Sequence, residues 1–542
     1  MEADRIYHDV ETKYGEYFKL PSLSLQSTLS SIESGKPINV RTPFYKGMSS
    51  QEIVQNWMPT LEKKIAQKWP GLLEFENDLA KKVGPLSYQK PLIERIDDID
   101  QYYTSVLRGG TPLDSRALAA TWKEWTNFSG IRLRGQSRTV ELMKKSTSSG
   151  SPYVTKRKRV VDQTIPCKVY LQHSGTCDEV VQILSGGTYK ACAILGWRGQ
   201  EGGPKVSDVK QRVVWMFPFA VNIAELTCYQ PLIEVAQMAN IVPAWVSMDA
   251  VDSEITKLFD TKAPDDLVIC TDFTKFDQHF NSHLQTAAYD ILGKLLRNEE
   301  TSTSWLDHVF PIKYNIPLTY RYGRMRFGAH GMGSGSGGTN ADETLAHRAL
   351  QHEAAILNGQ TLNPHSMCLG DDGVLSFPGI TEDVVMDAYT SHGLDMNPTK
   401  QMSSTQECVY LRRWHHRDYR VDGICAGVYS TCRALGRLAY QERYYDPHVW
   451  SSEMVILRSL SILENVKFHP LREEFADYCI KGDKYRLGLD IPGFFDELRL
   501  DNLVRKATNM MPDFLGFTKS QQKTNAGINS WWIVNYLKSK AK

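Results

Sequence analysis

The chain has 542 residues, of which 42% are hydrophobic and 23% charged, and this composition excludes a fibrous or disordered protein. Its length favours two to four structural units, and its 63 basic and 62 acidic residues nearly cancel, so the net charge gives no sign of a nucleic-acid partner. We expect a soluble intracellular protein with no membrane partner, because no apolar run approaches the roughly 18 residues of a membrane span and the first residues lack a secretion signal.

The N-terminal region, residues 1 to about 85, predicts an amphipathic helix. Ser49 and Glu52 have the spacing of a capping box, in which each side chain hydrogen-bonds the backbone of the other residue. Apolar residues follow at four-residue spacing: Ile53, Trp57, Leu61 and Ile65. Because this spacing puts them on one face, we expect the helix to pack on a larger body.

Basic residues concentrate between positions 131 and 160, where nine Lys or Arg residues accompany one Glu. The segment ends in the run Lys156, Arg157, Lys158 and Arg159. Since cations neutralise phosphates, this cluster predicts the wall of an RNA or nucleotide channel, with binding that weakens as salt rises. A localisation signal or a capsid-contact patch is the alternative, and Tyr153 either stacks on a template base or packs in the core.

Residues 265–280, DDLVICTDFTKFDQHF, predict a buried strand followed by acidic residues. Leu267 to Cys270 form the strand, Asp272 follows where the backbone leaves the sheet, and Asp277 lies five residues further on. A carboxylate at a strand end can face the acidic tip of another strand. The alternative is that Asp272 only caps a helix.

Residues 321–350 predict a hairpin, a glycine-rich loop and then a helix from about Asn340. A glycine loop at a helix start lets a nucleic-acid backbone approach closely and offers it backbone amides and hydroxyl groups. Two alternatives stay open. One is a flexible connector, and the other is a dinucleotide-binding loop on Gly331, Gly333 and Gly335, which would need a βαβ unit.

Residues 365–379, HSMCLGDDGVLSFPG, predict a β-hairpin with two adjacent carboxylates at its tip. Met367 to Leu369 and Val374 to Phe377 are the arms, and Gly370, Asp371, Asp372 and Gly373 form the turn. A solvated acidic turn is the simple alternative. Together with Asp272, however, the turn predicts a site for two Mg²⁺ ions, or Mn²⁺ in their place. Asp272 and Asp371 would bridge both ions, and Asp372 would be an auxiliary ligand.

The ordered set resembles motifs A, B and C of viral RNA-dependent RNA polymerases. Motif A is DFTKFD (272–277), motif B is SGSGGTN (334–340) and motif C is GDD (370–372). The wording of motif A, the glycine-rich motif B and the chain length are most similar to the polymerases of picobirnaviruses, with those of partitiviruses as near relatives. The resemblance spans roughly residues 205 to 415.

The resemblance implies an α+β fold, the closed right hand of fingers, palm and thumb. The palm would hold an antiparallel sheet, the thumb would be helical, and an N-terminal extension would bridge fingers and thumb. The expected boundaries are 1–85 for the extension, 86–215 for the fingers, 216–280 for the palm with motif A, 281–333 for a fingers insertion, 334–425 for the palm with motifs B to E, and 426–542 for the thumb and C-terminal tail.

The resemblance also implies roles for residues of motifs A and B. Asp277 would recognise the ribose 2′-hydroxyl, and Gly335 would contact RNA. The motif B residues beside the nucleotide would be Ser334, Thr339 and Asn340. Many relatives carry an asparagine four residues after the motif B threonine, but this chain has Glu343 there. The residue that completes sugar selection is therefore open.

Three further stretches resemble motifs F, D and E. In residues 202–218, Lys205, Lys210 and Arg212 would bind the triphosphate, since cations stabilise it and the departing pyrophosphate. In residues 393–401, Lys400 would protonate the pyrophosphate as a general acid. In residues 408–414, Arg412 and Arg413 would contact the backbone of the growing strand. Solvated basic surface is the alternative for the lysines.

The remaining signals are weaker. His415 and His416 have no Cys or acidic partner at metal-binding spacing, and the ten cysteines include no Cys-x-x-Cys pair, so we expect surface histidines, reduced thiols and no structural zinc. The tail, residues 524–542, combines Trp531, Trp532 and Tyr536 with late lysines. It either packs on the thumb or forms a movable plug in the product channel.

The implied reaction joins the 3′-hydroxyl of a growing RNA to the α-phosphate of a ribonucleoside triphosphate on an RNA template. The implied partners are RNA template and product, ribonucleoside triphosphates and viral capsid protein. The enzyme would be a monomer in the virion interior and host cytoplasm, where it replicates and transcribes a double-stranded RNA genome in two segments. One rival is a reverse transcriptase or DNA polymerase, which would carry a bulky residue in place of Asp277. The other is an RNA-binding capsid or packaging protein.

Overall fold

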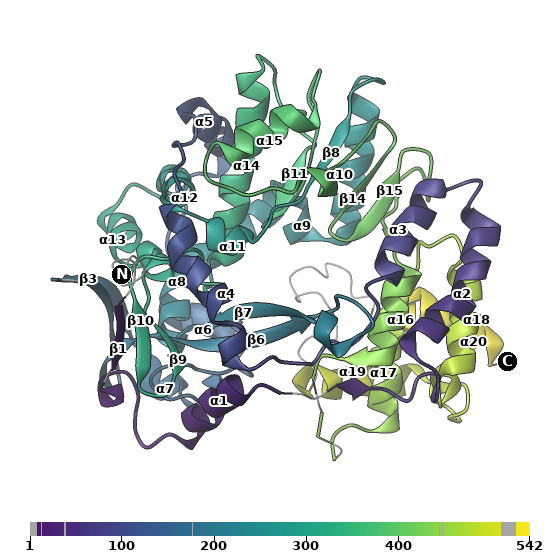
Figure 1. The fold of residues 1–542 in the computed structure, drawn as a ribbon, viewed down its shortest axis with the longest axis horizontal. Helices are drawn as coiled ribbons and strands as arrows, with labels where there is room; N and C mark the ends of the chain where they lie inside the picture. Colours follow the sequence, from purple (N-terminus) through teal and green to yellow (C-terminus); the bar gives the residue numbers. More distant parts are fainter. Residues whose placement is uncertain are drawn as a thin grey trace.

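The computed structural model describes residues 8–11, 13–36, 39–175, 177–443, 445–446, 448–510 and 527–541. In Figure 1 they form three groups: a sheet with long helices at the top, a larger sheet at the lower left and a bundle of helices on the right. Within these described ranges, no helix combines the length and the apolar character that crossing a membrane requires.

A four-stranded antiparallel sheet lies in the upper group. In spatial order its strands are β11 (Met367–Leu369), β12 (Asp372–Leu375), β8 (Val268–Thr271) and β13 (Met402–Ser404). Successive side chains of β8 point to opposite faces. Val268 and Cys270 pack with helix α10 (Met248–Thr261), whereas Ile269 joins the core that contains helix α14 (Thr339–Leu357). The two acidic segments therefore belong to neighbouring strands of one buried sheet.

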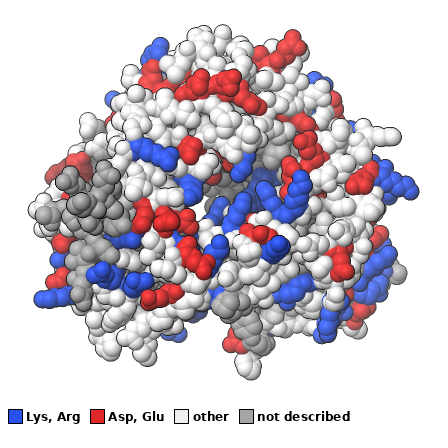
Figure 2. Space-filling view, in the orientation of Figure 1, with Lys and Arg blue, Asp and Glu red and all other residues white. Residues whose placement is uncertain are grey.

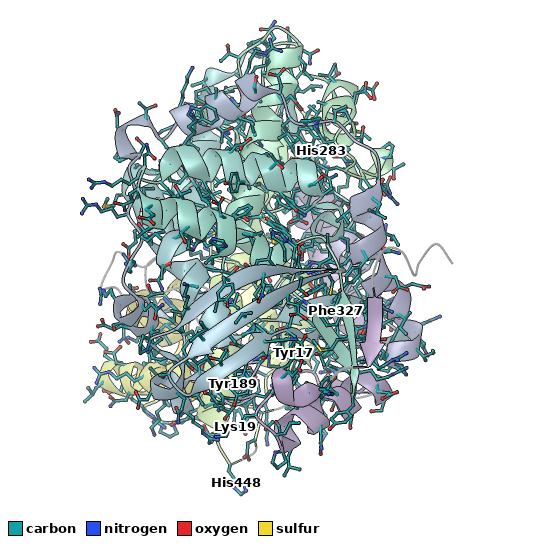
Figure 3. All side chains as sticks on the ribbon, turned by 90° about the vertical axis from the view of Figure 1, so that its left-hand side faces the viewer. Tyr17, Lys19, Tyr189, His283, Phe327 and His448 are labelled. Atoms are coloured by element: carbon teal, nitrogen blue, oxygen red, sulfur yellow. The ribbon has the colours of Figure 1, made fainter. Side chains whose placement is uncertain are left out.

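A five-stranded sheet joins three distant parts of the chain. Its spatial order is β1 (His8–Glu11), β10 (Arg324–Phe327), β9 (Leu318–Arg321), β6 (Ala193–Gln200) and β7 (Lys210–Met216). Neighbours are antiparallel except β6 and β9. Tyr17 and Phe327 share an apolar cluster on this sheet, and Figure 3 labels both beside its strands. A separate antiparallel sheet contains β3 (Lys168–Ser174), β4 (Cys177–Leu184) and β5 (Gly187–Ala191).

The C-terminal helices form the bundle on the right of Figure 1. They are α16 (Thr431–Ala439), α17 (Ser452–Glu464), α18 (Arg472–Gly482), α19 (Glu497–Met510) and α20 (Trp532–Lys540). Two N-terminal helices, α2 (Ser50–Ile65) and α3 (Pro70–Ala80), share their apolar core. The capping box of Ser49 and Glu52 is present and the apolar face of α2 is buried, which confirms the predicted amphipathic helix.

The N-terminal segment contacts both the five-stranded sheet and the bundle. β1 pairs with β10 in the sheet, whereas β2 (Val40–Arg41) pairs with β17 (Tyr440–Gln441) directly after α16. Helix α1 (Leu23–Ser34) lies against β6 and β9. The segment therefore runs from one body to the other, as Figure 1 shows.

The remaining elements complete the upper and left-hand groups. The helices are α4 (Ile96–Thr104), α5 (Ser115–Lys123), α6 (Gln136–Leu142), α7 (Val161–Thr164), α8 (Phe219–Ala239), α9 (Pro243–Val246), α11 (Phe276–His279), α12 (Ser282–Leu295), α13 (Glu300–His308) and α15 (Glu382–Thr390). A small antiparallel sheet of β14 (Glu407–Tyr410), β15 (Arg413–His416) and β16 (Val428–Tyr429) lies against β8 and β12 through β14.

Candidate active site

Asp272, Asp371 and Asp372 come together at one end of the four-stranded sheet. In the pairing of β8 with β12, Thr271 stands opposite Gly373, so the next pair outward is Asp272 and Asp372. Directly opposed residues of antiparallel strands have Cα atoms about 4.5 to 5.5 Å apart. The predicted hairpin is present, although its second arm begins at Asp372, two residues earlier than predicted.

Helix α14 holds the turn of this hairpin. Gly370 and Asp371 are the two turn residues, and Gly370 has a φ of 58°, a left-handed conformation that glycine adopts without strain. Thr344 Oγ1 accepts a hydrogen bond from Gly370 N at 3.0 Å, and His347 Nδ1 donates one to Gly370 O at 2.8 Å. Burial lowers the pKa of His347 to about 4, so at neutral pH the ring is uncharged and carries its proton on Nδ1.

Burial raises the pKa of both carboxyl groups at the hairpin tip. For Asp371 the nearby carboxylate of Asp277 adds to this effect, whereas Arg212 opposes it. Burial raises the pKa of Asp372 to about 7, even though Leu411 N donates a hydrogen bond to Asp372 Oδ2 at 2.8 Å. Mutually repelling carboxylates in a buried site are a donor set that suits a hard divalent cation.

The three carboxylates fit such an ion after side-chain adjustment. Among the residues that the structure describes, no three His, Cys, Asp or Glu side chains are already arranged to hold a metal. One oxygen of Asp372 is engaged by Leu411 N. Asp272 bonds Gln401 through backbone atoms, which leaves its carboxylate for a ligand. This difference is compatible with an auxiliary role for Asp372.

Glu343 lies between Asp277 and the hairpin turn. The residue is 5% exposed, and its Oε2 is 3.5 Å from the point where a Cβ on Gly370 would stand. Burial raises the pKa of Glu343 well above its ordinary value, and the adjacent Asp277 carboxylate raises it further. The protonated Glu343 therefore donates a hydrogen bond to the Asp277 carboxylate. The sequence marks this position as unusual but does not reveal the contact.

Polar side chains of motif B are used inside the protein. Ser334 Oγ accepts a hydrogen bond from Trp215 N at 3.2 Å, and Thr339 Oγ1 donates one to a loop carbonyl at 3.1 Å. Asn340 Oδ1 accepts one from Trp245 Nε1 at 2.8 Å. These three predicted nucleotide contacts hold the loop in place, and a contact of Ser334 or Thr339 with the sugar would require their hydroxyl groups to be released.

Helix α8 clamps the glycine loop through two buried polar residues. Glu225 accepts hydrogen bonds from Ser336 Oγ and, at 3.1 Å, from Gly337 N. Asn222 Nδ2 donates to Gly335 O and to Glu225 Oε1, each at 3.1 Å. Sequence analysis missed both residues. Their signal was the presence of polar side chains in a largely apolar helix.

Gly335 packs directly on strand β7. A Cβ at this position would lie 1.6 Å from Trp215 O, so the loop needs glycine for its contact with the protein. The structure thus explains Gly335 by packing, and its predicted contact with RNA stays a prediction. The dinucleotide-binding alternative is wrong, because the loop joins β10 to α14 and the next strand, β11, belongs to a different sheet.

Positive side chains from four segments gather beside the carboxylates: Lys82, Lys210, Arg212, Lys400 and Arg412. Burial lowers the pKa of Lys210, and the charges of Lys82 and Lys400 lower it further, whereas Asp272 opposes them. Burial also lowers the pKa of Arg412, to about 10. Figure 2 shows Lys and Arg gathered around a central hollow. Lys205, also predicted to bind the triphosphate, lies on an exposed turn.

Arg413 does not face RNA. Its guanidinium donates to both carboxylate oxygens of Asp252, at 2.8 and 3.0 Å, and the pair is buried. The prediction that Arg413 contacts the growing strand is therefore wrong, whereas Arg412 lies in the turn between β14 and β15. The expectation of surface histidines is also wrong. His415 is fully buried and donates to Cys425 O at 3.0 Å, and His416 is partly buried.

One member of the basic run has a structural role. Arg157 donates to Asn222 Oδ1 at 2.6 Å, and its guanidinium lies 5.2 Å from the centre of the Phe219 ring. Burial lowers the pKa of Arg157. The three other members are exposed: Lys156, Lys158 and Arg159. Tyr153 is half-buried and packs against the core, as the alternative interpretation had it.

The described part of the C-terminal tail packs on the helical bundle. Glu464 accepts hydrogen bonds from Trp532 N at 3.1 Å and Ile533 N at 3.0 Å. The buried side chains of α20 are Ile533, Val534 and Leu537. This is the simpler of the two interpretations of the tail. Residues 524–526 and 542 lie outside the described residues.

Known proteins share this arrangement. Residues 132–442 match the family model described as viral RNA-dependent RNA polymerase. A potential RNA-dependent RNA polymerase of human picobirnavirus (strain Human/Thailand/Hy005102/-) is 59% identical over 534 residues, which are 97% of this chain and 98% of that protein. The crystal structure of the RNA-dependent RNA polymerase of a human picobirnavirus matches with a TM-score of 0.91 at 58% identity, and its insertion loop deletion mutant with 0.90 at 57%. Each match covers 97% of this chain and 98% of the other. The chain therefore belongs to the viral RNA-dependent RNA polymerases, among the picobirnavirus enzymes, and has the right-hand fold of that family.

Proposed function

We propose that this polymerase extends RNA by metal-assisted nucleotidyl transfer at Asp272, Asp371 and Asp372. As a viral RNA-dependent RNA polymerase, the enzyme copies an RNA template from ribonucleoside triphosphates. The 3′-hydroxyl of the growing RNA attacks the α-phosphate, and pyrophosphate leaves. The observation that carries the proposal is the pairing of Thr271 with Gly373, which puts the motif A carboxylate beside the GDD turn.

Asp272 and Asp371 would hold two Mg²⁺ ions, with Asp372 as the auxiliary ligand and Mn²⁺ as the alternative metal. Two such ions activate the attacking oxygen and stabilise the charge that develops on the leaving oxygen. Burial and mutual repulsion of the carboxylates support this assignment, because a divalent cation offsets both. Thr344 and His347 support it further by fixing the turn that presents Asp371.

Lys210 and Arg212 would bind the triphosphate, with Lys205 as an outer contact. Lys400 would donate a proton to the leaving pyrophosphate, and Arg412 would contact the phosphate backbone of the growing strand. Their gathering beside the carboxylates supports these roles. Cations aimed at phosphate oxygens form charge-assisted hydrogen bonds and stabilise the negative charge that develops during transfer.

Asp277 would recognise the ribose 2′-hydroxyl, with Glu343 in place of the amide found in many relatives. A protonated carboxyl group resembles an amide in having one donor and one acceptor. The buried contact of Glu343 with Asp277 supports this arrangement, because it orients the Asp277 carboxylate toward the end of the sheet that carries the turn. Ser334, Thr339 and Asn340 would support the sugar site through the loop.

The exposed basic residues 156, 158 and 159 would line the RNA path, supported by their charge and exposure. The likeness to picobirnavirus polymerases also supports a wider proposal. A monomeric enzyme would replicate and transcribe a double-stranded RNA genome, inside the virion and in the host cytoplasm, in contact with capsid protein. In this proposal residues 1–85 bridge the fingers (86–215 and 281–333) and the thumb (426–542), and their contacts with the five-stranded sheet and the bundle support that division.

Purified protein with an RNA template, Mg²⁺ and labelled UTP tests the proposal. We expect RNA product, and we expect Asp371→Ala to reduce it by several orders of magnitude while Asp383→Asn, at an exposed position on α15, leaves it unchanged. Preference for deoxynucleotides would favour a reverse transcriptase. RNA binding without synthesis would favour a packaging protein, and full synthesis by Asp371→Ala would refute the role of the carboxylates.

A further inference from the structure

The segment between α3 and α4 runs along the β6–β7 hairpin. Gln211 Nε2 donates a hydrogen bond to Tyr88 O at 2.9 Å, and Lys90 N donates one to Gln211 Oε1 at 3.2 Å. A Cβ on Gly84 would lie 1.7 Å from Gly203 O, so the two backbones are in close contact there. The N-terminal segment therefore forms a fixed wall beside the strand that carries the proposed triphosphate ligands.

Lys82 immediately precedes this wall and lies beside Lys210. Of the charged neighbours of Lys210, Lys82 has the largest effect on its pKa, ahead of Lys400. Lys82 also lines a small cavity together with Glu201, from the loop between β6 and β7, and Arg437 of α16. Because Lys82 is exposed, its ammonium group is accessible to a ligand.

The lysines of this group lack acidic partners. Within the described part of the chain, no salt bridge joins Lys82, Lys210 or Lys400 to an acidic side chain. Glu201 is already paired with Arg433 at 3.5 Å and Arg437 at 3.4 Å. Like charges held close together repel each other, and a bound polyanion would convert that repulsion into attraction.

We propose that Lys82 binds the polyphosphate of the nucleotide together with Lys210, so that the N-terminal segment forms part of the substrate site. The inference rests on the proposed nucleotide path along β7. The ligand chemistry is a polyphosphate, which the incoming ribonucleoside triphosphate and the released pyrophosphate share. A lysine suits this ligand as a mobile point charge that can follow the phosphates from substrate to product.

Primer extension on a short RNA template tests the proposal with three variants and the wild type. Lys82→Met removes the charge and keeps the aliphatic stem, Lys81→Met is the matched control at the neighbouring exposed lysine, and Lys210→Met is the reference for the proposed path. For Lys82→Met we expect the KM for the nucleotide to rise about three- to tenfold with little change in kcat, and the difference to shrink as salt rises. Lys82→Arg should restore the wild-type KM, and Lys81→Met should match the wild type.

Inorganic pyrophosphate and tripolyphosphate, added as competitive inhibitors, separate the two sources of polyphosphate. Weaker inhibition of Lys82→Met by both supports contact with substrate and product, and weaker inhibition by pyrophosphate with an unchanged KM assigns Lys82 to product release alone. An unchanged KM and unchanged inhibition in Lys82→Met, beside a raised KM in Lys210→Met, would overturn the role of Lys82 and leave the nucleotide path intact. If Lys210→Met also behaves like the wild type, the proposed nucleotide path itself is wrong.

Discussion

Replacing Glu343 by Gln would remove the buried acid between Asp277 and the GDD turn while keeping its shape and a hydrogen-bond donor. Because the pKa of Glu343 in the folded protein is raised above its ordinary value, the native state binds more protons than the unfolded state between those two pKa values. The wild-type free energy of unfolding therefore falls as pH rises through this window. For one proton the slope is about 1.4 kcal/mol per pH unit.

Denaturant unfolding in EDTA, between about pH 5 and 8, measures this slope. The free energy of unfolding of Glu343→Gln, relative to the wild type, should increase with pH until the folded-state pKa is passed. Glu62→Gln, at an exposed position on α2, is the matched control and should follow the wild type. Parallel curves for the wild type and Glu343→Gln would mean that Glu343 is not held protonated, and would refute its hydrogen bond to Asp277.

Three further perturbations test the surroundings of the site. Glu225→Ala leaves three buried donors of the glycine loop and α8 without an acceptor, at about 1 to 3 kcal/mol each. Its kcat should fall at least about tenfold with the fold retained by circular dichroism, and an unchanged kcat would contradict the clamp. Asp252→Ala should lower the free energy of unfolding by about 3 to 5 kcal/mol, because it leaves the buried Arg413 cation unpaired, and a loss below about 1 kcal/mol would show that the pair is not structural. Alanine at the exposed basic positions should reduce the salt dependence of RNA affinity by about 0.7 to 0.9 in log–log slope per lost phosphate contact, and an unchanged slope would exclude from the RNA path Lys156, Lys158 and Arg159.

The active-site geometry was predictable because local patterns carry it. Asp272 follows an apolar run and the GDD tip lies between two apolar arms, so both sit at strand ends. Motif order then identified the family and, through it, the fold. The hairpin register was less predictable. Asp372 opposes Leu369 within the ladder, and a polar residue at a strand start gives no pattern that separates strand from turn.

The errors arose where the partner of a side chain is distant in the sequence. Arg412 and Arg413 are equivalent as a pattern, but Arg413 begins β15 and points to Asp252, which is 161 residues away. The contact of Glu225 with the glycine loop spans 111 residues. Such pairs depend on how whole bodies pack. Lys82 had no signal of its own, because exposed lysines are common on any soluble surface.

The central claim is that Asp272 and Asp371 together hold the catalytic ions. Its most direct test is a titration of Mn²⁺, followed by electron paramagnetic resonance, into polymerase bound to a primed template and a non-hydrolysable nucleotide. We predict two bound ions in the wild type, and the loss of at least one ion together with primer extension in both Asp272→Asn and Asp371→Asn. Variants that bind both ions and extend RNA at the wild-type rate would contradict the account.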